Sequence, residues 1–205
     1  MTKRELLLRT FHNEPADRVP VGFWFHFAAD ELLDLFENPE LLDINLGGHQ
    51  KFYRDFQPDF VKIMTDGFFV YPNEIFRKAR RARELRDMVS IGEDHPWIER
   101  QIAFAKTITG AFGSEVMTFY NIFAPATLFK FARAGQALAP DRILADFITE
   151  DRDAVIHALT VAAGDLAILV RRIISEAKAD GIYYSAQDTD DPRITGEQHR
   201  DILAP

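Results

Sequence analysis

The segment DFVKIMTDGFFVYP, residues 59–72, combines a short apolar run with an Asp-Gly pair, Asp66 and Gly67. The run predicts a buried strand over residues 59–64. In α/β folds, side chains that bind or catalyse gather just past the carboxyl ends of strands. Asp66 occupies such a position and is the first candidate functional residue, although an ordinary Asp-Gly turn is the alternative interpretation.

Three other segments have strand character. Residues 19–27, VPVGFWFHF, are apolar and aromatic, which favours a strand buried on both faces. Residues 116–123, VMTFYNIF, and 181–187, GIYYSAQ, predict two more strands. Together with residues 59–64 they give four strands.

Helical patterns separate these strands. Thr2 and Glu5 form a capping-box pattern at the start of the first helix. Residues 73–94 are expected to be irregular. Helices are expected over residues 3–12, 30–56 with a break near Pro39, 95–112, from Pro125 through Phe131, 151–179 and 195–203. Strands joined by helical crossovers imply right-handed βαβ units and a parallel sheet.

Composition restricts the class of protein. The 205 residues are 47% hydrophobic, enough for one core, so a single domain over residues 1–205 is expected. The net charge of -8 disfavours a nucleic-acid or membrane partner. The absence of cysteine excludes thiolate nucleophiles, disulfides and cysteine-ligated metals. A charged N-terminus and the lack of a clear apolar span predict a cytoplasmic protein.

Four segments resemble, in order and spacing, the uroporphyrinogen decarboxylase family. They are LRTFHNEPADRVPV (8–21), DFVKIMTDGFFVYP (59–72), APATLFKFARAG (124–135) and ADGIYYSAQ (179–187). Members are (β/α)8 barrels that need no cofactor, and the decarboxylase branch removes carboxylates from a tetrapyrrole in porphyrin and haem biosynthesis. The resemblance implies an incomplete (β/α)8 TIM-type barrel with about four parallel strands, the N-terminal half of the family fold. The open edges of such a half-sheet call for a homodimer or the missing C-terminal half as partner.

The resemblance also suggests site residues for a small-molecule substrate. Asp66 falls on the catalytic aspartate, which accepts hydrogen bonds from pyrrole N–H groups and stabilises developing positive charge. His26 is the candidate proton donor, because an imidazole titrates near neutrality; a histidine hydrogen-bonded in the lining is the alternative. No arginine lies between Arg18 and Arg54, where the family has substrate-binding arginines. Further candidate substrate-binding residues are Trp24, Phe25, Tyr71, Asn121, Phe131, Ser185 and Gln187. Of these, Phe131 falls at the family's tyrosine, and Ser185 replaces an aspartate.

Two other functions are compatible with the sequence. The methyltransferase branch of the superfamily moves methyl groups from corrinoid carriers to thiols with a zinc ion; the arginine-free segment 19–27 suits it, but the chain has no cysteine. The second is a non-catalytic half-barrel module. No metal site is expected, because the acidic cluster Asp188, Asp190 and Asp191 is more typical of a solvated turn.

Overall fold

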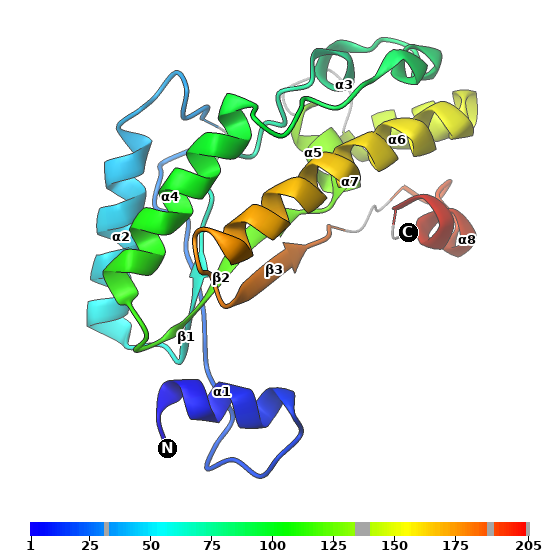
Figure 1. Ribbon diagram of the computed structural model, residues 1–205. Coiled ribbons are helices and arrows are strands. Elements are labelled where there is room, and N and C mark those ends of the chain that lie inside the picture. Colours follow the sequence, from blue (N-terminus) through cyan, green and yellow to red (C-terminus); the bar gives the residue numbers. More distant parts are fainter. Residues whose placement is uncertain (31–32, 134–139, 188–190, 204–205) are drawn as a thin grey trace. The chain divides into compact units, whose positions relative to one another are not determined.

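The computed structural model describes residues 1–30, 33–133, 140–187 and 191–203 (Figure 1). The elements in chain order are α1 (Lys3–Phe11), α2 (Leu41–Phe56), β1 (Phe60–Ile63), α3 (Glu74–Lys78), the 3-10 helix η1 (Ala82–Asp87), α4 (Pro96–Phe112), β2 (Met117–Phe123), α5 (Pro125–Phe131), α6 (Pro140–Glu150), α7 (Arg152–Ser175), β3 (Gly181–Ser185), α8 (Gly196–Gln198) and the π-helical turn η2 (His199–Leu203). The chain divides into two compact units. The first contains residues 1–68, 98–122 and 169–183, and the second the remainder.

The strands form one sheet in the order β1-β2-β3. β1 and β2 are parallel, with Phe60 opposite Met117 and Ile63 opposite Tyr120. Val61 and Ile63 are buried, as expected for a strand with a covered face. The α/β class is therefore right, but the expected incomplete barrel with four strands is wrong: the described residues form three strands in a single sheet.

The missing strand is the segment 19–27, which lies beside β1 without pairing with it. Two of its backbone donors bond to side chains: the N–H of Val21 donates to Asp59 at 2.7 Å, and that of Phe27 donates to Asp66 at 2.9 Å. The carbonyl of Val21 accepts from the backbone N–H of Asp59 at 2.8 Å, just before β1. Pro20 has no N–H to offer. The segment is also not buried on both faces, since Val19 is 79% exposed. The side chains of two aspartates that flank β1, together with the backbone bond at Asp59, thus hold the segment where the apolar composition predicted a paired strand.

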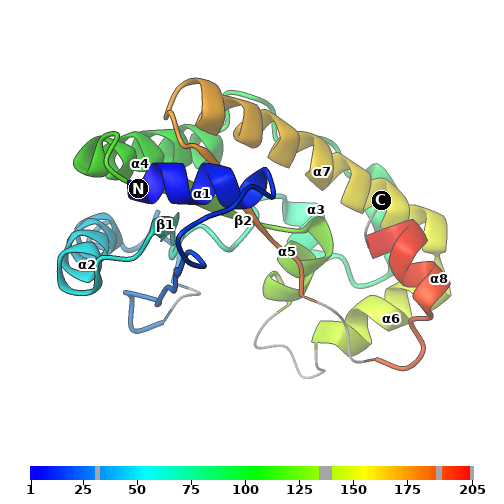
Figure 2. The same cartoon turned by 90° about the horizontal axis from the view of Figure 1, so that it is seen from below.

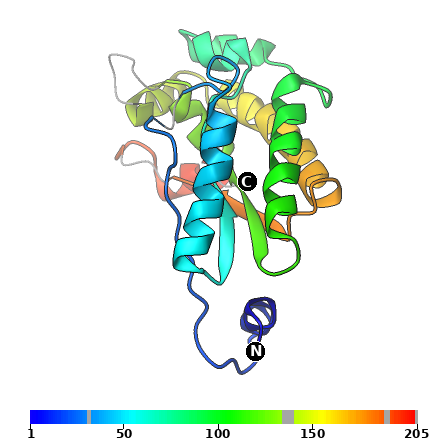
Figure 3. The ribbon, with the colours of Figure 1, turned by 90° about the vertical axis from the view of Figure 1, so that its left-hand side faces the viewer.

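The first unit contains the helices α2 and α4, which lie side by side (Figure 3). Both were expected, although the described residues before Leu41 contain no helix over 33–40. At the N-terminus, the capping box of α1 is confirmed: the N–H of Glu5 donates to the Thr2 hydroxyl, and the N–H of Thr2 donates to Glu5.

The second unit contains α3, η1, α5 and α6 (Figure 2). The buried guanidinium of Arg133 donates to the carbonyls of Ala79 and Phe76, at 2.7 and 2.9 Å, and so joins the end of α5 to α3. The expectation of irregular structure over 73–94 is wrong for α3 and η1. Helix α6 was missed, although Ile143, Leu144, Phe147 and Ile148 recur at helical spacing.

Helix α7 is an exception to the expectation that no segment resembles a membrane span. Among the described residues it alone is long and apolar enough to cross a membrane, by length and composition. Its residues Ala154, Ala158, Ala162, Leu169 and Ile173 are buried by the rest of the chain, as in the core helix of a water-soluble protein. The structure is therefore compatible with a soluble protein.

Two adjacent glycines of α2 provide a test of how the segment 19–27 is held. A Cβ added at Gly48 would lie 2.4 Å from the ring of Phe27, whereas one added at Gly47 would meet nothing within 4 Å. We expect Gly48→Ala to lower the free energy of unfolding by about 1–3 kcal/mol, through overpacking. Gly47→Ala, the matched control, should raise it by up to about 1 kcal/mol through helix propensity. Urea denaturation measures both, and equal effects would contradict the packing of Phe27 on α2.

Candidate functional site

Asp66 is fully buried, and its carboxylate accepts hydrogen bonds from the chain itself. One oxygen lies 2.8 Å from Nδ1 of His26. The other accepts from the N–H of Phe27 at 2.9 Å and from that of Ala28 at 3.4 Å. Because an ionised carboxylate only accepts, Nδ1 of His26 carries the proton in this contact. The side chain of His26 is 44% exposed, so the pair presents an imidazole rather than a carboxylate to the outside.

The turn that carries Asp66 depends on a glycine. Gly67 has φ +95°, a conformation that side chains disfavour, and a Cβ there would approach Cβ of Leu35 to 2.9 Å. The carbonyl of Gly67 accepts from the N–H of Leu35 at 3.0 Å. Helix α2 holds the neighbouring peptide: Nδ2 of Asn45 donates to the carbonyl of Asp66 at 3.1 Å. The Asp-Gly turn is therefore real, and it places the carboxylate at the end of β1.

A second histidine supports the same turn. His49 is buried; it accepts from the N–H of Met64 through Nε2 at 2.9 Å and donates through Nδ1 to the carbonyl of Asn45 at 2.7 Å. Burial lowers the pKa of His49 to about 4. This histidine is neutral near pH 7 and joins α2 to the end of β1.

A lysine and two aromatic rings form a third feature, here called the Lys62 cluster: Trp24, Lys62 and Tyr183. Nζ of Lys62 lies 4.4 Å from the ring centroid of Trp24 and 4.1 Å from that of Tyr183. Lys62 is only 7% exposed, and burial lowers the pKa of its amine to about 8, against the opposing attraction of Asp66. The cluster joins the segment 19–27, β1 and β3 within the first unit.

The other candidates of the first unit have packing roles. Phe25 contacts the rings of Phe23, Phe52 and Phe56. Asn121 is buried, and its Nδ2 donates to the hydroxyl of Thr65 at 3.3 Å, which ties β2 to the end of β1.

The remaining candidates lie in the second unit. Tyr71 is buried, and its hydroxyl donates to Asp165; burial and this carboxylate raise the tyrosine pKa. Phe131 stacks on Phe69 at 5.4 Å. The carbonyl of Ser185 accepts from Ala124, and the N–H of Gln187 donates to Thr127. Of the expected set, the structure pairs His26 with Asp66, while Trp24 belongs to the Lys62 cluster.

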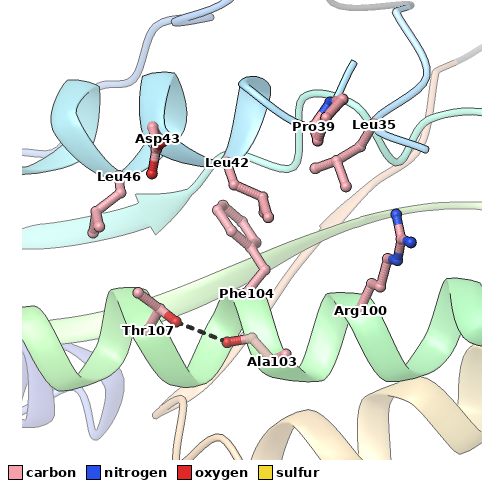
Figure 4. A pocket seen from close by; sticks show the side chains of 9 residues that line it. All are labelled: Leu35, Pro39, Leu42, Asp43, Leu46, Arg100, Ala103, Phe104 and Thr107. Atoms are coloured by element: carbon pink, nitrogen blue, oxygen red, sulfur yellow. Dashed lines mark hydrogen bonds between the residues drawn. The ribbon is translucent and has the colours of Figure 1, made fainter. Parts of the chain in front are cut away.

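A groove between α2 and α4 has a volume of about 490 Å³ (Figure 4). Leu35, Leu42, Leu46 and Phe104 give it an apolar lining, and the guanidinium of Arg100 lies 4.1 Å from the ring of Phe36. The groove contains no histidine, so we assign no proton-transfer chemistry to it.

The described residues contain no group of three or more His, Asp or Glu that could hold a metal ion. In the acidic cluster, Asp191 is paired with Arg193 at 2.7 Å, while Asp188 and Asp190 lie outside the described residues. Arg193 also lowers the pKa of Asp191 to about 2.

Sequence reasoning missed Lys62, Tyr183, Asn45 and His49. The signal for Lys62 was a charged residue inside the apolar run 60–64. Asn45 and His49 are one helical turn apart on α2, a spacing that places two polar side chains on one face. Nothing local to Tyr183 indicated that it would meet β1.

No family model, no curated protein and no solved structure matches the chain. The resemblance of the four segments to the uroporphyrinogen decarboxylase family remains a prediction.

The lowered pKa of His49 predicts a loss of stability in acid. The unfolded chain takes up a proton near pH 6.5, whereas the folded histidine stays neutral down to about pH 4. The free energy of unfolding should therefore fall as the pH falls from about 6.5 to about 4, by up to about 3 kcal/mol from this residue.

The variant His49→Gln isolates this contribution. Its side-chain oxygen can still accept from Met64, but it does not titrate. Urea denaturation at pH 7 and pH 4.5 should give a smaller difference for His49→Gln than for the wild type. The exposed variant His12→Gln is the control, and a pH dependence identical in all three proteins would contradict the burial of a neutral His49.

Proposed function

We propose that the chain is a cytoplasmic member of the uroporphyrinogen decarboxylase superfamily that removes a carboxylate from a tetrapyrrole-like substrate without a cofactor. The observation that carries the proposal is the pairing of buried Asp66 with exposed His26, at 2.8 Å. The family resemblance supplies the reaction, because its catalytic aspartate falls on Asp66. The lack of disulfide-forming cysteine fits a reducing compartment.

The pair suits the proton-transfer part of a decarboxylation. When a carboxylate leaves as carbon dioxide, the bonding electrons stay on carbon, and that carbon takes up a proton. The imidazolium of His26 can donate this proton, and solvent can restore it. A buried anion at Nδ1 stabilises the charged ring and fixes its orientation, as the aspartate of a catalytic triad does.

Asp66 acts through His26 in this proposal. Its two oxygens are occupied by His26, Phe27 and Ala28, so a direct contact with pyrrole N–H groups would require these donors to leave. Asp66 is thus a positioning residue, and His26 is the catalytic residue.

Anaerobic incubation with uroporphyrinogen tests the proposal. Products are oxidised and counted by their carboxylates with liquid chromatography and mass spectrometry. We expect turnover by the full chain, a loss of about 100-fold or more in His26→Gln, and a comparable loss in Asp66→Asn. His12→Gln, an exposed histidine of the same type, should keep full activity.

The controls separate chemistry from folding. The side chain of His26 is 44% exposed, so we expect His26→Gln to fold. Circular dichroism checks that it does. Turnover that survives in His26→Gln would refute the assigned role. No turnover by the folded wild type would refute decarboxylation, and zinc-dependent methyl transfer from methylcobalamin to a thiol would replace it with the methyltransferase branch.

A further inference from the structure

Lys62 is a buried cation without an anionic partner. In the part of the chain that the structure describes, its amine forms neither an ion pair nor a hydrogen bond, and its side chain is 7% exposed. Buried charged groups are normally paired, because the loss of hydration is costly. Arg133, which is 2% exposed, illustrates the usual arrangement, because its two terminal nitrogens donate to backbone carbonyls.

The surroundings of the amine compensate only part of this cost. The faces of Trp24 and Tyr183 attract the ammonium by cation–π interaction. The Asp66 carboxylate attracts the ammonium from the end of β1. Its hydrogen bonds, however, are formed with His26, Phe27 and Ala28. The ammonium thus retains unused capacity to donate hydrogen bonds to an acceptor.

The rings also define the shape of what can approach. Trp24 is 37% exposed, Tyr183 is partly exposed, and their centroids are 5.0 Å apart at an interplanar angle of 60°. Exposed aromatic faces beside a cation bind planar rings by stacking. Trp24 and the proton-donating His26 come from the same short segment, so a ligand bound here lies near the imidazole.

We propose that Lys62, Trp24 and Tyr183 bind a planar heteroaromatic ligand through a carboxylate, which pairs with the lysine amine while the ring packs against Trp24. This inference rests on the proposed function, since it names the group that holds the substrate. Lys62 supplies the cation that the segment 19–27 lacks. The ligand carboxylate completes the pairing of the buried charge.

The binding depends on pH in a defined direction. The titratable groups around the amine are Asp66 at the end of β1, His26 on the neighbouring segment and Tyr183 on β3. Burial lowers the pKa of Lys62 to about 8, so the amine is mostly charged at pH 7 and mostly neutral at pH 9. Carboxylate affinity should therefore fall as the pH rises through 8.

Calorimetry with pyrrole-2-carboxylate and its neutral isostere pyrrole-2-carboxamide tests the site. At pH 7 we expect the wild type to bind the carboxylate at least 10-fold more tightly than the carboxamide. Lys62→Met should abolish this preference, and Lys62→Arg should retain it. Lys51→Met, which removes an exposed lysine paired with Asp55, is the matched control and should behave as the wild type.

The outcomes are distinguishable from those of the decarboxylase assay. Equal affinity of the wild type for both probes, no binding of either, or an unchanged preference in folded Lys62→Met, would overturn the site. These results do not depend on turnover. If the carboxylate preference is present but no decarboxylation occurs, the binding site stands and the proposed reaction fails.

Discussion

The buried carboxylate of Asp66 is the interaction on which this region of the chain depends. A charge removed from water must be matched by donors, and here they come from His26, Phe27 and Ala28. At the other end of β1, Asp59 accepts from Val21 and from both terminal nitrogens of Arg18. The segment between these two anchors is therefore fixed beside β1 by charge-assisted hydrogen bonds.

Helix α2 connects the turn at Asp66 to the core. Asn45 and His49 contact the backbone of Asp66 and Met64, and Gly48 leaves room for the ring of Phe27. All three residues lie on one face of the helix, at spacings of three and four. One helix face thus positions both the carboxylate and the segment that satisfies it, which explains why such polar residues are buried in the middle of a helix.

The sequence predicted the elements well where one periodicity dominated. β1, β2, β3 and most helices were found from apolar runs and helical spacing. The prediction of a strand over 19–27 was wrong because apolar composition does not reveal where backbone donors bond. Here the N–H groups of Val21 and Phe27 bond to the side chains of Asp59 and Asp66. The proximity of His26 to Asp66 was predicted from position and chemistry. The Lys62 cluster depends on Tyr183, which is 121 positions further along the chain than Lys62. Contacts of that range arise from sheet order, which no local pattern encodes.

The charge balance of the chain bears on the carboxylate binding that we propose for the Lys62 cluster. With a net charge of -8, the protein repels anions at long range, so a carboxylate must be recognised by a local contact that is strong at short distance. A largely buried ammonium would provide this contact, because the attraction between opposite charges grows as water is excluded. One such cation can neutralise one carboxylate. In the proposed reaction, a substrate with several carboxylates would therefore be oriented by a single group, and the orientation of that group relative to His26 would decide which carbon receives the proton.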